Sequence, residues 1–346
     1  MTRIAVWNTA FLGDAVLTLP LLQSLRLRYP KAVLDFYVRG GGLAALFVRN
    51  SIISSVYTYD KQGKEKGFAG LIRLGRELSK RKYDVWISAH GSLRSSLLAM
   101  ASRAPVRIGY RQSALAGLCH THVVDRQFGR LDEIERLLQL LRPLGPGPES
   151  HWPEIVLGRQ EIREAESFFA ELGGPVLGLH PGSVWATKRW PASYFAEIGR
   201  RALRTGADVL LFAGPGEEDI ALSVYEHISA KSGRNEKSRL HNLSGRLSLP
   251  LFAAYISRLS CYVTNDSGPM HLAWSQHVPV TALFGPTVRS LGFSPRGLTS
   301  SVCETPIACR PCGLHGPISC PLKHHHCMTR ISPDHVWEEV REKLLL

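Results

Sequence analysis

The sequence predicts an α/β protein built from two doubly wound domains. Short apolar runs of strand length alternate with amphipathic segments of helical length, and this alternation stops once, at a stretch rich in proline and glycine, before it resumes. Alternating strands and helices indicate βαβ units around a mainly parallel sheet. A chain of 346 residues is long enough for two such domains, each with a core of its own.

The first half of the chain carries one round of this alternation. We expect strands over residues 3–7, 33–38, 52–59, 84–88 and 107–110, and helices over 14–25, 71–78, 92–101 and 131–141. Pro20 is expected to kink or break the first helix. Gly13 and Asp14 follow the first strand, at the edge of the sheet where ligands bind in open α/β folds. Asp14 is therefore either the N-cap of the first helix or a general base.

The stretch Pro143–Pro148, followed by Pro153, marks the predicted domain boundary. Beyond it we expect strands over 176–180, 209–212, 261–263 and 278–284, and helices over 161–172, 192–203 and 251–259. The loops 181–191, 214–218, 265–271 and 285–287 follow these four strands. They should open on one side of the second sheet, because the carboxyl ends of parallel strands share an edge.

The composition is that of an ordinary globular chain with a strong positive charge. Hydrophobic residues make up 44% and charged residues 21%, and the net charge is +13. This charge predicts an anionic partner, which is a nucleic acid, an acidic membrane surface or a phosphorylated substrate. Asp14 interrupts the first apolar run and no run of about 18 apolar residues occurs, so neither a signal peptide nor a membrane span is expected. Seven cysteines, with Cys119 and Cys261 isolated in apolar surroundings, favour a reducing cytoplasm over a disulfide framework.

The most informative stretch is Tyr262–Ala273, where an apolar strand, a polar turn and a helix start follow one another. The turn Asn265–Ser267 supplies N-cap residues, and Pro269 suits the first helical turn. A helix N-terminus presents unpaired N–H groups and the positive end of the helix dipole, which together bind phosphate. His271 would be aimed at the same place. The alternative is an ordinary connection between a strand and a helix.

Two further loops complete a predicted nucleotide-diphosphate site. Lys188 and Arg189 offer positive charge to phosphate, unless they only form a solvated basic loop. Glu217 and Glu218 offer a carboxylate to the two hydroxyls of a ribose, as in dinucleotide folds. No GxGxxG follows the first strand and no GxxxxGK[ST] occurs, so the sequence contains neither a dinucleotide fingerprint nor a P-loop.

The motifs that carry a family resemblance are Gly13-Asp14 with Pro20, Lys188-Arg189-Trp190-Pro191, Gly214-Pro215-Gly216-Glu217 and Asn265-Asp266-Ser267-Gly268-Pro269-Met270-His271. In this order, over nearly the whole chain, they resemble the ADP-heptose:lipopolysaccharide heptosyltransferases, and heptosyltransferase II in particular. The resemblance implies a GT-B glycosyltransferase fold, in which two Rossmann-like domains face a cleft. An acceptor-binding domain would span 1–155 and an ADP-sugar-binding domain 156–331. A last helix over 332–346 would pack back on the first domain.

The resemblance also implies a reaction and its site. The enzyme would transfer heptose from ADP-heptose to the Kdo/heptose inner core of lipopolysaccharide, with inversion and without a metal. Asp14 matches the catalytic base. The residues that match the ADP-sugar site are Thr187, Lys188, Glu217 (or Glu218, if the alignment slips by one residue), Asp266, Ser267, Gly268 and His271.

A phosphorylated lipid acceptor would explain the positive charge. The enzyme is then expected in the cytoplasm of a Gram-negative bacterium, peripheral to the anionic surface of the inner membrane. The candidate acceptor-binding residues are Lys61, Lys64, Arg94 and Arg111. A general solvated surface is the alternative for each of these residues.

The tail holds Cys309, Cys312, Cys320 and Cys327 beside three histidines. Their spacing allows a structural zinc, while free thiols, a disulfide or an iron–sulfur site stay open. Catalysis is expected to need no cofactor, because no Asp-x-Asp pair occurs that could hold a divalent ion.

The main alternative to a heptosyltransferase is an enzyme of the same fold that acts on another nucleotide sugar, either another glycosyltransferase or an epimerase. Nucleic-acid binding is disfavoured because no aromatic clusters interleave with the basic residues.

Overall fold

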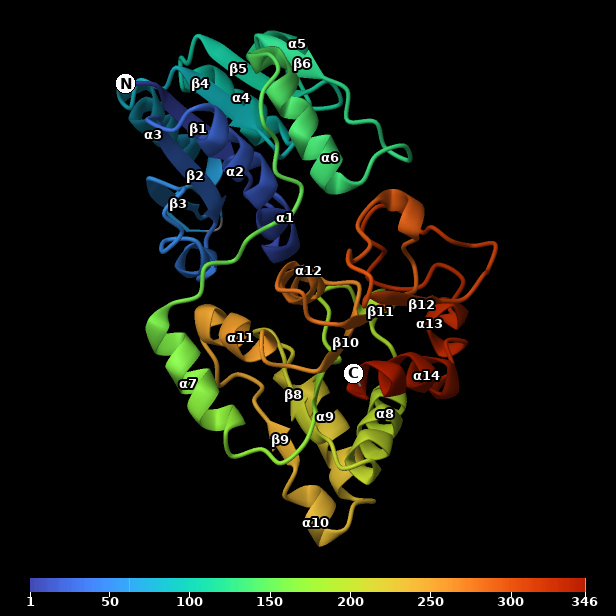
Figure 1. Ribbon diagram of the computed structural model, residues 1–346. Coiled ribbons are helices and arrows are strands. Elements are labelled where there is room, and N and C mark those ends of the chain that lie inside the picture. The colour runs from blue at the N-terminus through green and yellow to red at the C-terminus, as the bar shows by residue number, and fades with distance from the viewer. Residues whose placement is uncertain (62, 346) are drawn as a thin grey trace. The chain divides into compact units, whose positions relative to one another are not determined.

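The computed structural model describes residues 1–61 and 63–345, and the chain forms two compact units, Met1–Val156 and Leu157–Leu346 (Figure 1). This division lies one residue from the boundary between 155 and 156 that the family resemblance implies, and a few residues after the predicted linker. Within the described residues, no helix has both the length and the apolar character needed to cross a membrane.

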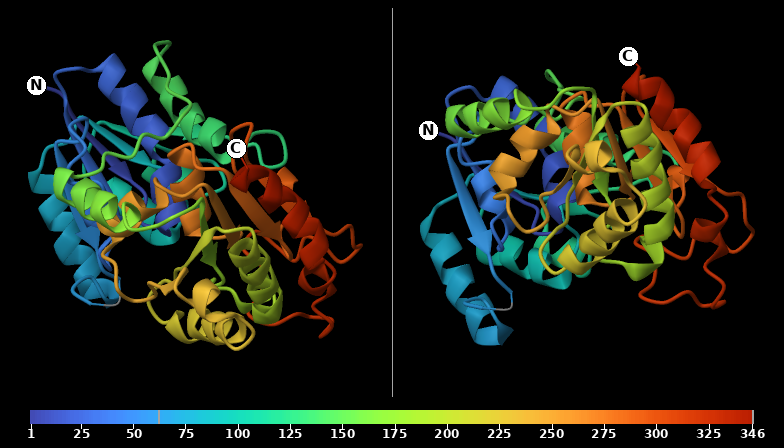
Figure 2. Two further views of the ribbon diagram at one scale, coloured as in Figure 1. Left: turned by 60° about the horizontal axis from the view of Figure 1, so that its bottom comes forward. Right: turned by 90° about the horizontal axis from the view of Figure 1, so that it is seen from below.

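The first unit is a parallel sheet with helices on both faces. Its elements, with 3₁₀ helices labelled η, are β1 (Arg3–Trp7), α1 (Leu12–Leu17), α2 (Leu19–Arg28), β2 (Val33–Arg39), η1 (Leu43–Leu46), β3 (Ser55–Tyr59), α3 (Gly67–Lys80), β4 (Val85–Ser88), α4 (Leu93–Ala101), β5 (Val106–Tyr110), α5 (Ala116–Cys119), β6 (His122–Val124), α6 (Glu133–Leu138) and η2 (Gln139–Leu144). The strand order is β3-β2-β1-β4-β5-β6. Helices α3 and α4 cover one face, and α1, α2 and α6 cover the other (Figures 1 and 2).

The core of this unit is built around the central strand β1, which pairs with β2 on one side and β4 on the other. Its residues from Ile4 to Trp7 are buried, as expected of a strand covered on both faces. Under α3 and α4, the rings of Trp7, Tyr37 and Trp86 lie with centroids 5.4 to 5.7 Å apart. The first predicted helix is broken between α1 and α2, with Pro20 in the first turn of α2. The predicted break is confirmed. A new helix can begin at this point because proline is tolerated in a first helical turn.

The second unit repeats this architecture. Its elements are α7 (Arg159–Phe169), β7 (Val176–His180), η3 (Ala186–Lys188), α8 (Ala192–Arg204), β8 (Asp208–Leu211), α9 (Glu218–Ser229), α10 (Arg234–Lys237), β9 (Leu240–Asn242), α11 (Leu249–Ile256), β10 (Cys261–Asn265), α12 (Gly268–Ser275), β11 (Val280–Phe284), η4 (Arg289–Leu291), β12 (Ser301–Glu304), α13 (His326–Thr329) and α14 (Pro333–Leu344). The strand order is β12-β11-β10-β7-β8-β9. Helices α8, α9 and α14 lie on one face, and α7, α11 and α12 on the other (Figures 1 and 2).

Both sheets have the strand order of a Rossmann fold. Within each unit the spatial order runs third, second, first, fourth, fifth and sixth strand. The order in which the chain adds parallel strands therefore changes direction between β1 and β4 in the first unit, and between β7 and β10 in the second. Ligands of doubly wound sheets bind beyond the carboxyl ends of the strands at such a switch point.

The last helix, α14, packs in the second unit. Val336, Val340 and Leu344 are buried in the same apolar core as residues of α8. Arg201 of α8 also pairs with Asp334 at 2.7 Å. This packing assigns α14 to the second unit, while its expected contact with the first domain stays a prediction. Its apolar stripe, spaced i, i+4 and i+8, is buried against α8 and the second sheet.

Candidate functional site

The predicted donor loops meet at the carboxyl edge of the second sheet. They follow β7, β8, β10 and β11, which are neighbours in the order β11-β10-β7-β8. At the switch point, His180 at the end of β7 lies opposite Thr264 near the end of β10. The prediction that these loops open on one side of the sheet is confirmed.

Lys188, at the end of η3, reaches the turn that follows β10. Its Nζ lies 2.6 Å from Oδ2 of Asp266, and the hydroxyl of Thr287 donates to the same oxygen at 2.6 Å. All three side chains are buried. In a buried pair of this kind, each charge depends on the other for compensation. Asp266 therefore fixes the position of the ammonium group, and Thr287 fixes the position of Asp266.

Asn265 holds the two switch-point loops together. Its Oδ1 accepts from the backbone N–H of Trp190 at 3.0 Å, and its Nδ2 donates to the carbonyls of Pro181 and Gly182 at 2.8 and 3.2 Å. Sequence reasoning assigned this residue only to the turn. Because it is fully buried and bonds to both ends of loop 181–191, Asn265 fixes the position of that loop relative to the end of β10.

The helix N-terminus predicted to bind phosphate is present. Helix α12 begins at Gly268, with Ser267 as its N-cap and Pro269 in its first turn. The hydroxyl of Ser267 lies 3.3 Å from that of Thr264, so it remains near the strand end and does not cap the helix. Pro269 has no N–H, and the N–H of Met270 donates to the carbonyl of Ser267 at 3.1 Å. Anion binding at this end of α12 would therefore rest on the N–H of Gly268 and on the positive end of the helix dipole.

His271 is buried in the first turns of α12, and its ring is oriented by Trp274. The indole Nε1 of Trp274 donates to Nδ1 of His271 at 3.1 Å. Since Nδ1 accepts, the ring proton of the neutral imidazole is on Nε2. Burial lowers the pKa of His271 to about 4, outweighing the nearby charge of Asp266. At neutral pH the ring is therefore an uncharged hydrogen-bond donor.

The carboxylate of Glu217 lies beside the end of β7, against His180 and Gly182. Its carboxylate oxygen Oε2 lies 3.7 Å from Nε2 of His180, and Nδ1 of that ring lies 2.9 Å from the hydroxyl of Tyr262. A Cβ at Gly182 would stand only 2.1 Å from Oε2, so glycine is required for the carboxylate to lie there. Glu218 lies instead next to Gly245. Of the two candidates, Glu217 is thus the one directed to the donor loops.

The cysteine-rich tail packs against the loop that contains Lys188. The hydroxyl of Thr187 donates to the carbonyl of Pro317, and Nε2 of His325 lies 2.7 Å from the carbonyl of Thr187. The rings of Trp185 and His315 stack with centroids 6.3 Å apart. The Thr187 hydroxyl and carbonyl are therefore both engaged by the tail, and the contact of Thr187 with a diphosphate stays a prediction.

The four tail cysteines are free thiols. Burial raises the pKa of the Cys312 and Cys327 thiols, while backbone N–H groups, first that of His325, lower the pKa of Cys320. Among residues 1–61 and 63–345, no three His, Cys, Asp or Glu side chains are arranged to hold a metal ion. The structural zinc that the cysteine spacing allows stays a prediction, and elemental analysis of the purified protein would test it directly.

Asp14 stands at the third position of α1, and Phe11 is the N-cap. The backbone N–H of Phe11 donates to Oδ2 of Asp14 at 3.1 Å. Desolvation and the nearby Glu133 raise the pKa of Asp14 to about 6, although the Phe11 N–H and Arg126 act in the opposite direction. Glu133 is buried and is held at 2.6 Å by both Arg126 and Arg136. A carboxyl group with a pKa near neutrality is suited to accept a proton.

The four candidate acceptor residues are not equivalent. Lys61, Lys64 and Arg111 are exposed. Arg94 instead binds its own unit: Nη1 donates to the hydroxyl of Tyr59 at 2.9 Å and to the carbonyl of Glu65 at 3.2 Å. Arg94 therefore holds the lysine-containing loop in place, which leaves the lysines of that loop as the freer cations.

The profile of "Glycosyltransferase family 9 (heptosyltransferase)" matches residues 71–312. Lipooligosaccharide heptosyltransferase 2 of Campylobacter jejuni is 24% identical over 342 residues, covering 98% of each chain. Among solved structures, a family 9 glycosyl transferase of Veillonella parvula has a TM-score of 0.85 at 25% identity, covering 99% of this chain and 97% of its own.

The ADP-heptose lps heptosyltransferase II of Escherichia coli has a TM-score of 0.78 at 24% identity, covering 100% of this chain and 99% of its own. The architecture, two six-stranded parallel sheets with helices on both faces, is the predicted GT-B fold. The matched region includes β4 to β6 of the first sheet, all six strands of the second sheet, and the Lys188, Glu217 and Asp266 loops. The chain belongs to glycosyltransferase family 9, the heptosyltransferases.

Proposed function

We propose that this enzyme transfers heptose from ADP-heptose to the inner core of lipopolysaccharide with inversion of the anomeric centre. The family membership and the names of the relatives support the sugar and the acceptor class. The observation that carries the donor assignment is the convergence of Lys188, the N-terminus of α12 and Glu217 at one sheet edge. Positive groups suit a diphosphate, and a carboxylate suits ribose hydroxyls.

The leaving diphosphate is proposed to bind at Lys188 and the start of α12. The Nε2–H of His271 adds a neutral donor, because Trp274 occupies the other ring nitrogen. Fixed donors directed at developing negative charge stabilise the transition state without reorganisation. Asp266 contributes by holding Lys188 in position.

Asp14 is proposed as the general base that deprotonates the acceptor hydroxyl. Inverting transfer needs one base for the attacking hydroxyl. Its pKa of about 6 leaves Asp14 ionised at neutral pH, yet makes it more basic than an ordinary aspartate. The exposed Lys61 and Lys64 are proposed to bind the anionic groups of the acceptor, at the cytoplasmic face of the inner membrane.

A screen of nucleotide sugars by thermal shift tests the donor assignment. ADP-linked sugars should raise the melting temperature, while UDP- and GDP-linked sugars should leave it unchanged. A ligand at about 100 times its Kd adds about 2.7 kcal/mol of stability, which a thermal melt readily detects. Stabilisation by a UDP-sugar alone would favour the alternative, an enzyme of the same fold that acts on another nucleotide sugar.

Transfer is expected to proceed unchanged in EDTA. The proposed cations at the diphosphate are Lys188 and the N-terminal end of α12, and the sequence has no Asp-x-Asp pair to present a divalent ion. Turnover is measured after dialysis against EDTA, with and without added Mg²⁺. Activity that disappears in EDTA and returns only with Mg²⁺ would contradict this leaving-group assignment.

A further inference from the structure

Helices α3 and α4 carry large apolar side chains on the outside of the first unit. Phe68 and Ile72 of α3 are 74% and 40% exposed, and Leu93 and Met100 of α4 are 49% and 48% exposed. The spacings 68, 72 and 93, 97, 100 place each set on one side of its helix. Large exposed apolar patches on soluble proteins mark interaction sites.

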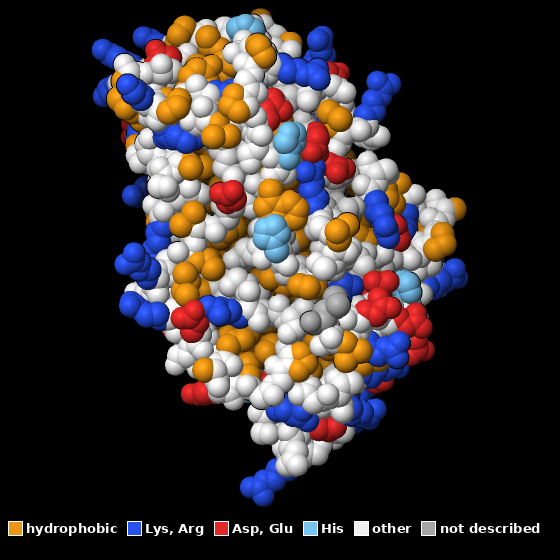
Figure 3. Space-filling view, in the orientation of Figure 1, with side chains coloured by type: hydrophobic (Ala, Val, Ile, Leu, Met, Phe, Trp, Pro, Cys, Tyr) orange, Lys and Arg blue, Asp and Glu red, His pale blue; other side chains and the backbone are white. Residues whose placement is uncertain are grey.

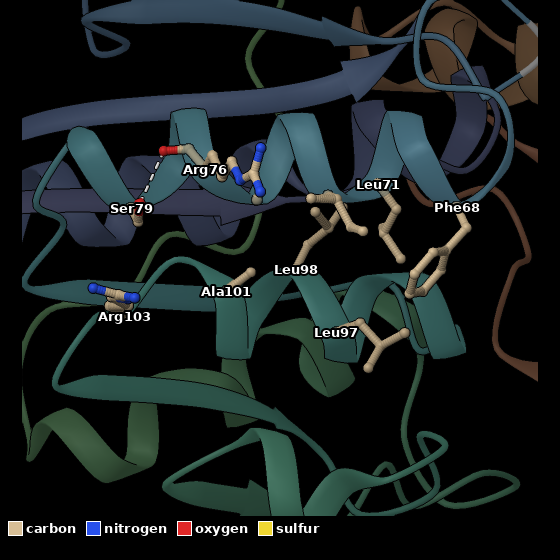
Figure 4. Close-up of a pocket in the computed structure, with 10 residues that line it drawn as sticks. Phe68, Leu71, Arg76, Ser79, Leu97, Leu98, Ala101 and Arg103 are labelled. Atoms are coloured by element: carbon tan, nitrogen blue, oxygen red, sulfur yellow. Dashed lines mark hydrogen bonds between the residues drawn. The ribbon is translucent and has the colours of Figure 1, made fainter.

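A groove of about 300 Å³ separates the two helices (Figure 4). The helices approach closely at its floor, where a Cβ at Gly75 would stand 2.9 Å from that of Ala101. Figure 4 shows Phe68 directed toward Leu97 at one end of the groove, and Arg103 near Ser79 at the other. The groove is therefore apolar at the end where both helices begin and cationic at the end where they finish.

The charges around this groove are mainly positive. Arg76, Lys80 and Arg103 are exposed at its cationic end, beside the acidic Glu77. On the face of the molecule shown in Figure 3, lysine and arginine side chains are spread over the surface with hydrophobic side chains between them. We call Phe68, Ile72, Leu93, Met100, Arg76, Lys80 and Arg103 together the α3–α4 face.

Exposed apolar residues flanked by cations are typical of surfaces that lie on anionic bilayers. The apolar side chains enter the boundary between headgroups and acyl chains, and the cations attract lipid phosphates. A nucleic acid would match the charge, but it offers no apolar phase to Phe68 and Ile72. A second copy of the chain would bring the same cations face to face.

We propose that the α3–α4 face docks the first unit on an anionic lipid bilayer. Phe68 and Ile72 enter the headgroup region, while Arg76 and Arg103 bind lipid phosphates. The apolar end of the face adjoins the lysine-containing loop, because Gly67, the first residue of α3, accepts a hydrogen bond from Arg94 of α4. Docking would thus bring the proposed acceptor residues to the membrane surface. The inference concerns lipid binding itself and does not depend on which sugar is transferred.

Vesicle sedimentation without any sugar substrate tests this proposal. The full chain is mixed with vesicles of phosphatidylcholine alone, or with about one-third phosphatidylglycerol, and the bound fraction is measured. We expect binding to the anionic vesicles and little to the neutral ones. Phe68→Ser with Ile72→Ser should weaken binding by about tenfold or more at unchanged net charge, because two apolar anchors are lost. R76E with R103E should abolish the preference for anionic lipid.

Matched variants in the second unit serve as controls. Leu222→Ser removes a 43% exposed leucine on α9, and R234E with K237E reverses two exposed charges on α10. Both should leave vesicle binding unchanged. Transfer to a water-soluble acceptor without acyl chains should also be unchanged in the α3–α4 variants, which separates this inference from the proposed function.

Three results would overturn the proposal. The first is equal binding of the wild-type chain to neutral and anionic vesicles, and the second is full binding by the Phe68→Ser, Ile72→Ser variant. The third is a dimer in solution that these two substitutions dissociate, which would assign the face to a second copy of the chain.

Discussion

Asp14→Asn is expected to lower turnover by about 10²–10⁴-fold, the usual cost of removing a general base. The affinity for ADP should stay within about twofold of wild type, because the proposed nucleotide contacts all lie in the second unit. Turnover is measured by release of ADP, and affinity by calorimetry. Turnover within tenfold of wild type would remove Asp14 from the mechanism.

The pH profile gives an independent reading of the same residue. The ionised carboxylate is the active form and its pKa is about 6, so kcat/KM should fall about tenfold per pH unit below that value and level off above it. This acidic limb should disappear from the residual activity of D14N. A profile that stays flat down to pH 5 would contradict the assignment.

Loss of fold is not expected to confound this experiment. A carboxyl group whose pKa is higher in the folded than in the unfolded state favours folding only when it is protonated. That contribution is present below the unfolded pKa and is lost as the pH rises through about 6. Replacing Asp14 by asparagine removes the buried charge, so the melting temperature at pH 8 should hold or rise.

Asp84→Asn is the matched control. Asp84 lies at the start of strand β4, away from its carboxyl end, so this variant should keep full turnover.

Lys188→Ala is expected to weaken ADP binding by about 10–100-fold, the cost of losing a hydrogen bond to a charged group. AMP should lose far less affinity, because the proposed partner of Lys188 is the diphosphate. The substitution also leaves Asp266 without its buried counter-charge, next to an anionic ligand. The double variant K188A/D266N should therefore bind ADP better than K188A alone. Equal losses for AMP and ADP would assign Lys188 a structural or ribose-binding role.

Glu217→Ala provides the contrasting case. Its carboxylate lies beside His180 and is proposed to bind the ribose, so AMP and ADP should weaken by similar factors. Glu218→Ala is the matched control, since that side chain lies next to Gly245. If Glu218→Ala alone weakened both nucleotides, the ribose contact would belong to Glu218.

The sequence determined the local part of this structure. The alternation of apolar runs with amphipathic segments was enough for two doubly wound units, and Pro20 and Ser267–Pro269 set helix breaks and starts where the structure has them. Periodicity and capping act over a few neighbouring residues, so a sequence reveals them directly. The short strands β6, β9 and β12 escaped prediction, because three or four residues at a sheet edge carry no readable period.

Tertiary structure alone decided which side chains meet. Thr287 bonds to Asp266 from a different loop, and the Tyr262 hydroxyl reaches His180 across two paired strands. The pKa of Asp14 is raised first by burial and then by the charge of Glu133, more than a hundred residues further along the chain. The last helix packs on α8 because its apolar stripe is buried in the core of the second unit. Each of these contacts joins residues distant in sequence, and the strand order and the packing of helices on the sheets bring them together.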